Sequence, residues 1–102
     1  MSFNGNEGAP ISIQDAAQLT KNFRATFPNQ PIANFVGEEW IKQLLSQEGA
    51  KGLRIYNGLD AEGNIKPIIV AANSVENDML ELAINYTVPC PSRCSSANPL
   101  NS

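Results

Sequence analysis

The sequence predicts an α+β fold in which two amphipathic helices pack on a small, mainly antiparallel sheet of three to four strands. Three observations support this class. In two segments of the first half, apolar residues recur every three or four positions, which is the helical period. Two strand-like runs then flank a loop that contains Asp60, Gly63 and Asn64, as in a hairpin. Finally, apolar residues alternate with polar or small ones from Leu80 to Val88, which is the period of a strand.

The chain has 102 residues, enough for one hydrophobic core. We therefore expect a single domain at 11–89. The preceding residues, 1–10, include Gly5, Gly8 and Pro10 and predict a flexible tail. The residues that follow, 90–102, are rich in proline and serine and predict an irregular tail.

The first helix is expected to begin at Ser12, which together with Asp15 resembles a capping box. The acid also suits the positive end of the helix dipole. Because Pro28 cannot continue a helix, the helix should end before it. The apolar stripe of this helix consists of Ala16, Leu19, Phe23 and Phe27.

The second helix should follow Gly37 and open with the acids Glu38 and Glu39. The segment before it, residues 31–36, fits either a brief strand or an extended connection. Gly49 fits the left-handed position that often follows the end of a helix. The apolar face of this helix consists of Trp40, Ile41, Leu44 and Leu45.

The two hairpin strands are expected at 52–57 and 66–72. The second is apolar on both faces, whereas two helices are enough to cover only one face of a small sheet. Ile69 and Ala71 therefore need a cover, either the N-terminal helix on the opposite face or a second copy that pairs through Tyr56, Ile69 and the neighbouring strand. Because a contiguous apolar patch usually marks an interface, we expect a homodimer.

Arg54 and Tyr56 should project from the same face of the first hairpin strand. Both residue types are enriched where proteins bind partners, so Arg54, Tyr56 and Ile69 form the predicted partner-binding surface. The alternative is an ordinary surface Arg54 that stacks on its neighbour Tyr56.

Composition excludes several classes of function. The chain has no histidine, which removes the commonest general base, the commonest metal ligand and every histidine-dependent nucleophile. Its seven basic residues are spread singly among ten acidic ones, which argues against binding nucleic acid. No apolar run reaches membrane-spanning length and no secretory signal is recognisable, so we expect a cytoplasmic protein without membrane association. Nucleotide-binding glycine patterns are also absent, and we expect no cofactor.

Carboxylate pairs are the remaining candidates for acid–base chemistry. They are better explained as first-turn charges of a helix and as solvated turn residues. The run that begins at Asp60 resembles the start of a calcium loop, but its twelfth position is Ala71 instead of the required glutamate. We therefore predict no catalytic residues. The pairs are Glu38 with Glu39, Asp60 with Glu62, and Glu76 with Asp78.

Cys90 and Cys94 flank Pro91, Ser92 and Arg93 in a proline-containing turn. Three interpretations are open. The cysteines are free thiols in a C-terminal tail, or they form a local disulfide in an oxidising compartment. In the third, they are half of a zinc site that a second chain completes, because zinc takes four ligands and this chain has two thiolates.

The segment Gly-Leu-Arg-Ile-Tyr-Asn-Gly-Leu-Asp at 52–60 and the Cys-Pro-x-x-Cys tail at 90–94 resemble a group of small uncharacterised bacterial proteins. The resemblance covers roughly residues 32–100 and implies a bacterial α+β domain. No activity is established for that group, so the resemblance implies no catalytic or binding residue.

Three functions remain compatible with these observations. The first is a non-enzymatic interaction or structural module that self-associates, which the lack of a reaction centre favours. The second is a small-molecule binder or enzyme that uses loop carboxylates, with Arg54 or Lys66 as anion contacts. The third is a thiol-linked or metal-linked function of Cys90 and Cys94.

Overall fold

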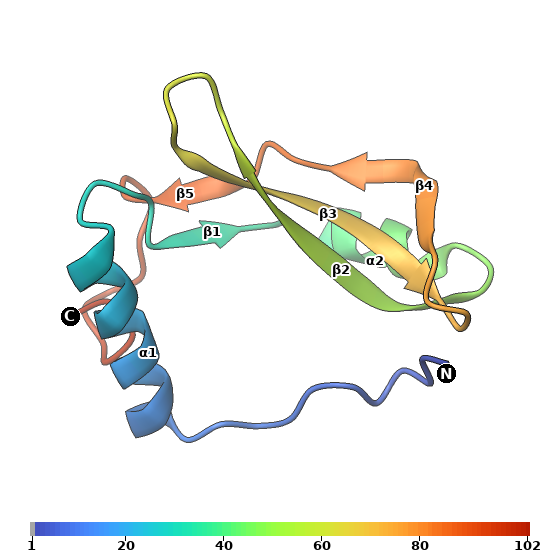
Figure 1. Ribbon diagram of the computed structural model, residues 1–102, viewed down its shortest axis with the longest axis horizontal. Helices are drawn as coiled ribbons and strands as arrows, with labels where there is room; N and C mark the ends of the chain where they lie inside the picture. The colour runs from blue at the N-terminus through green and yellow to red at the C-terminus, as the bar shows by residue number, and fades with distance from the viewer. Residues whose placement is uncertain (1) are drawn as a thin grey trace. The chain divides into compact units, whose positions relative to one another are not determined.

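The computed structural model describes residues 2–102. They form an α+β structure with two helices and two antiparallel sheets, one of three strands and one of two (Figure 1). The elements are α1 (Ile13–Thr26), β1 (Ala33–Phe35), α2 (Glu38–Ser46), β2 (Ala50–Leu59), β3 (Ile65–Asn73), β4 (Asp78–Ile84) and β5 (Val88–Cys90).

The chain divides into two compact units. The sheet unit consists of residues 2–8 and Val36–Thr87 and contains α2, β2, β3 and β4. The ribbon unit consists of Ala9–Phe35 and Val88–Ser102 and contains α1, β1 and β5. That 11–89 behaves as one domain stays a prediction, and its bounds match those of neither unit.

The three-stranded sheet has the order β2-β3-β4, so β3 lies in the centre (Figure 1). β2 and β3 form the predicted hairpin. Its turn is organised by Asp60, whose carboxylate accepts hydrogen bonds from the backbone N–H groups of Glu62 and Asn64, each at 2.9 Å. Gly63 takes a φ of 82°, a conformation that suits glycine.

Helix α2 covers one face of this sheet. Leu44 is fully buried and clusters with Ile69, Ala71 and Ile84. Ile69 is only 5% exposed, so it belongs to the core and not to the predicted partner-binding surface. The predicted cover of Ile69 and Ala71 was either the N-terminal helix or a second copy, whereas in the structure these residues pack against Leu44 of α2.

The ribbon unit joins segments that are distant in sequence. Ala33 lies opposite Cys90, and Phe35 lies opposite Val88. Helix α1 begins as predicted, because the Ser12 hydroxyl accepts a hydrogen bond from the N–H of Asp15 at 3.1 Å. No residue of α1 is buried, so its packing as an amphipathic helix stays a prediction.

Two local predictions differ from the structure. The strand predicted over 80–88 is divided, because Tyr86 takes a φ of 45° and interrupts the extended backbone between Ile84 and Val88. Val88 therefore continues in β5. Gly49 has the expected left-handed backbone, with a φ of 93°, but α2 already ends at Ser46 and Gly49 lies in the turn before β2.

Candidate functional site: the open edge of β2

The candidate site is the outer edge of β2, which has no strand partner within residues 2–102. The strand is ten residues long. Two large apolar side chains along it, Ile55 and Leu59, are 61% and 71% exposed. A long edge strand with exposed apolar side chains presents unpaired backbone groups and is a template for pairing with another chain.

The opposite edge of the sheet, β4, is less suited to pairing. It has seven residues, and its register with β3 shifts between Val70 and Ala71. Such irregularities, together with a charged residue such as Glu81 in the strand, protect an edge from pairing. β2 also has a register shift, between Ala50 and Gly52, but its pairing with β3 is regular from Gly52 to Leu59, and this longer regular stretch is the better candidate.

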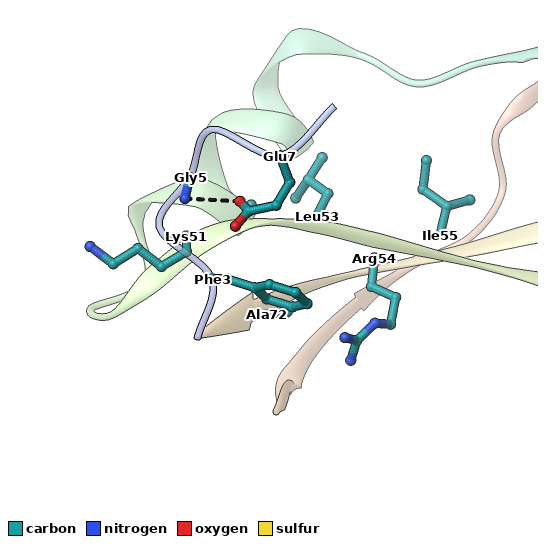
Figure 2. A pocket seen from close by; sticks show the side chains of 9 residues that line it. Phe3, Gly5, Glu7, Lys51, Leu53, Arg54, Ile55 and Ala72 are labelled. Atoms are coloured by element: carbon teal, nitrogen blue, oxygen red, sulfur yellow. Dashed lines mark hydrogen bonds between the residues drawn. The ribbon is translucent and has the colours of Figure 1, made fainter. Parts of the chain in front are cut away.

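Residues 2–8, which we call the N-terminal strap, lie beside the first residues of β2 (Figure 2). The N–H of Phe3 donates a hydrogen bond to the carbonyl of Ser74 at 2.9 Å. The Glu7 carboxylate accepts hydrogen bonds from the N–H groups of Asn4 and Gly5, each at 3.0 Å. These bonds lower the pKa of Glu7, and the bond from Asn4 has the largest effect. The described part of the predicted N-terminal tail, residues 2–10, thus has no helix or strand, but its residues 3–7 make defined contacts.

A groove of about 370 Å³ lies between the strap and β2. Figure 2 shows Leu53 and Ile55 on one side of β2 and Arg54 on the other, as the strand alternation requires. The ring of Phe3 lies on the same side as Arg54, and its centroid is 5.5 Å from the guanidinium carbon. This distance is typical of a cation–π contact.

Arg54 and Tyr56 converge on one carboxylate, Asp78 at the start of β4. The Nη1 of Arg54 lies 2.6 Å from Oδ1 of Asp78, and the hydroxyl of Tyr56 donates to the other oxygen, Oδ2. Arg54 also donates to the carbonyl of Glu76 at 3.2 Å. The prediction that Arg54 and Tyr56 share a face agrees with this geometry. The stacking partner of Arg54 is Phe3, whereas the sequence alternative named Tyr56.

The pKa values in the cluster of Arg54, Tyr56 and Asp78 suit a structural role better than a role in proton transfer. The hydrogen bond from Tyr56 and then the bond from Arg54 lower the pKa of Asp78. The same hydrogen bond to Asp78 raises the pKa of Tyr56, and Asp78 raises the pKa of Arg54. An effective general acid or base has a pKa near the working pH. Because both shifts lead away from neutrality, Asp78 stays ionised and Tyr56 stays protonated.

Asp78 and Phe3 were not predicted as partners of Arg54. Asp78 is 24 residues from Arg54 in sequence, on a strand two positions away in the sheet. The two residues come close because Gly52 and Asp78 both lie opposite Ala72. No local sequence pattern specifies this register, so the sequence carries no signal for the contact. For Phe3, the only clue was a single apolar side chain in the predicted tail.

The other predicted site residues belong to the ribbon unit. Cys90 and Cys94 form a disulfide in the ribbon unit, with Cα atoms 4.8 Å apart, which corresponds to the second of the three interpretations. Across residues 2–102, no three or more His, Cys, Asp or Glu side chains gather as a metal site would require. The same residues contain no helix with the length and apolar character needed to cross a membrane.

Comparison with models of known protein families finds no match to this chain. Searches among curated proteins and among solved structures find no match either. The resemblance to a group of bacterial proteins therefore stays a prediction, and the function has to be argued from the geometry of the chain itself.

Proposed function

We propose that the protein is a non-enzymatic interaction module that self-associates by pairing the β2 edges of two copies. The observation that carries this proposal is the pair of exposed apolar side chains, Ile55 and Leu59, on an edge strand that no other strand of residues 2–102 pairs with. The surface differs from the predicted one, because Arg54 and Tyr56 adjoin the edge whereas Ile69 lies in the core.

The sequence of β2 favours one antiparallel register, centred on Asn57. In this register Ile55 lies opposite the partner's Leu59, so the exposed apolar side chains cover each other. Arg54 lies opposite the partner's Asp60, so opposite charges meet at both ends of the pairing. The backbone of the strap approaches β2 at Lys51, before the paired segment 54–60, and within that segment the Phe3 ring contacts the side chain of Arg54.

Self-pairing is favoured over an unrelated partner because this register is complementary to itself. A two-fold axis through Asn57 repeats each contact twice and places no like charges opposite each other. Pairing of the two β2 edges also leaves neither of them open. Association should therefore stop at the dimer, because the irregular edge at β4 remains unpaired.

The test is the mass of the full chain in solution, measured by analytical ultracentrifugation over a range of concentrations. We expect a reversible dimer. Ile55→Lys should weaken the dimer at least about tenfold, because a lysine on an edge strand opposes pairing and the apolar contact is lost. The matched control is Leu80→Lys on β4, where the leucine is 77% exposed and the dimer should persist.

A wild-type chain that stays monomeric at high concentration would contradict the proposal. So would a dimer that Leu80→Lys disrupts and Ile55→Lys leaves intact. Circular dichroism of each variant separates loss of association from loss of folding.

The cytoplasmic location stays a prediction, and a structural disulfide is more typical of oxidising compartments.

A further inference from the structure

A second hollow lies within the ribbon unit. It has a volume of about 350 Å³, within the size range of sites that bind small molecules. Ile32 and Phe35 line it from the first segment of the unit, and Val88 and Leu100 line it from the second. The disulfide completes the apolar wall. Phe35 is 67% exposed, so a large ring is available to a ligand at the rim.

Among residues 2–102, Arg93 is the only charged side chain that lines this hollow, and no aspartate or glutamate of these residues lines it. The hollow is therefore positive, although the whole chain has a net charge of −3. Arg93 forms no ion pair with any described residue, unlike Arg54. Its guanidinium is free to bind an anion.

The backbone holds Arg93 in place. It lies inside the loop that the disulfide between Cys90 and Cys94 closes, and its N–H donates a hydrogen bond to the carbonyl of Pro89 at 3.1 Å. A cation at a fixed backbone position loses less freedom on binding than one on a mobile tail. The disulfide thereby supports a binding residue, in addition to closing the loop.

We propose that the hollow binds a small aliphatic carboxylate, with the hydrocarbon chain against Ile32, Val88 and Leu100 and the carboxylate on Arg93. Apolar walls favour the chain because its burial removes hydrocarbon from water. A guanidinium favours the carboxylate because the two groups can form paired hydrogen bonds. A cationic amphiphile would place its charge against Arg93 and should be rejected.

The test is a titration of the full, oxidised chain with octanoate, followed by amide chemical shifts in NMR spectra. We expect saturable binding, with the largest shifts at Phe35, Val88 and Leu100. Octanol lacks the charge and should bind about tenfold more weakly, which is the usual value of a hydrogen bond to a charged group. Octylammonium should give no saturable shifts in these residues.

Arg93→Gln should lower the affinity for octanoate about tenfold and leave that for octanol unchanged. Arg93→Lys keeps the charge but not the paired geometry, and should retain part of the affinity. The control is Lys42→Gln, which removes an exposed cation from the sheet unit and should change nothing. Octanoate that binds no more tightly than octanol or octylammonium would overturn the proposal. Arg93→Gln with wild-type affinity would overturn it as well, whether or not the β2 edge dimerises.

Discussion

The two units of this chain are stabilised in different ways. Six of the seven buried residues within 2–102 belong to the sheet unit, and four of them, Leu44, Ile69, Ala71 and Ile84, form its hydrophobic cluster. The ribbon unit has one buried residue, Cys90, and that residue is in the disulfide. A small region cannot bury enough apolar surface to stabilise itself, so covalent and polar links take the place of a core.

Arg24 of α1 supplies two of the polar links within the ribbon unit. Its guanidinium donates hydrogen bonds to the carbonyl oxygens of Leu100 at 2.8 Å and Ser102 at 3.0 Å. These bonds connect two segments that are more than seventy residues apart in sequence. Exposed hydrogen bonds of this kind contribute little stability each, so the disulfide should dominate in this unit.

The largest effect should come from the core of the sheet unit. Leu44→Ala should lower the free energy of unfolding by about 2–5 kcal/mol, because it removes buried methyl groups and leaves a cavity. Urea denaturation followed by the fluorescence of Trp40, the only tryptophan, would measure it. The neighbouring Leu45 is 47% exposed, and Leu45→Ala should cost about 1 kcal/mol or less. Equal losses in the two variants would mean that the stability does not depend on the cluster around Leu44.

The next effect should be confined to the ribbon unit. Replacing Cys90 and Cys94 with serine should destabilise this unit by about 2 kcal/mol, at the low end for a disulfide because the closed loop is short. Amide hydrogen exchange should become faster in β1 and β5 and stay unchanged in β3. Reductant should have the same effect on the wild-type chain and none on the double variant. Faster exchange in β3 would show that the two units depend on each other.

The smallest effect should come from the polar cluster of Arg54, Tyr56 and Asp78. The pKa of Asp78 is lowered from its ordinary value of 3.8, so its contribution to stability is present above that pH. The contribution disappears as the pH falls through the lowered pKa. Asp78→Asn should therefore lower the melting temperature by a few degrees at pH 7, and the difference from wild type should shrink in strong acid.

Thermal melts of both proteins at neutral and strongly acidic pH would measure this difference. The control is Lys42→Gln, which removes an exposed ion pair to Glu38 at 3.6 Å and should change the stability by about 0.5 kcal/mol or less. A pH-independent difference between Asp78→Asn and wild type would contradict the role of the ionised carboxylate.

Local features of the fold were predictable because their signals are close together in sequence. Ser12 and Asp15 specify the start of α1 within four residues, and Asp60 organises a turn through bonds to Glu62 and Asn64. The alternation of Arg54 and Tyr56 along β2 likewise places both side chains on one face. None of these features depends on which strand lies next to which.

The predictions that were wrong concern features that depend on neighbouring strands. The alternation over 80–88 predicts which side chains share a face, but it does not show whether the whole segment belongs to one sheet. In the structure the left-handed backbone of Tyr86 divides the segment between β4 and β5. Ile69 was predicted to be exposed because its strand is apolar on both faces. A strand in the centre of a sheet has the same composition, and β3 is such a strand. Its place in the centre follows only from the order of the strands.

The sequence by itself therefore determined the α+β class, the hairpin, the cap of α1 and the shared face of Arg54 and Tyr56. The tertiary structure decided which face α2 covers, which edge of the sheet stays open and which carboxylate Arg54 binds. The reason is physical: a side-chain period specifies the two faces of a strand, whereas its neighbours are selected by contacts between residues far apart in the chain.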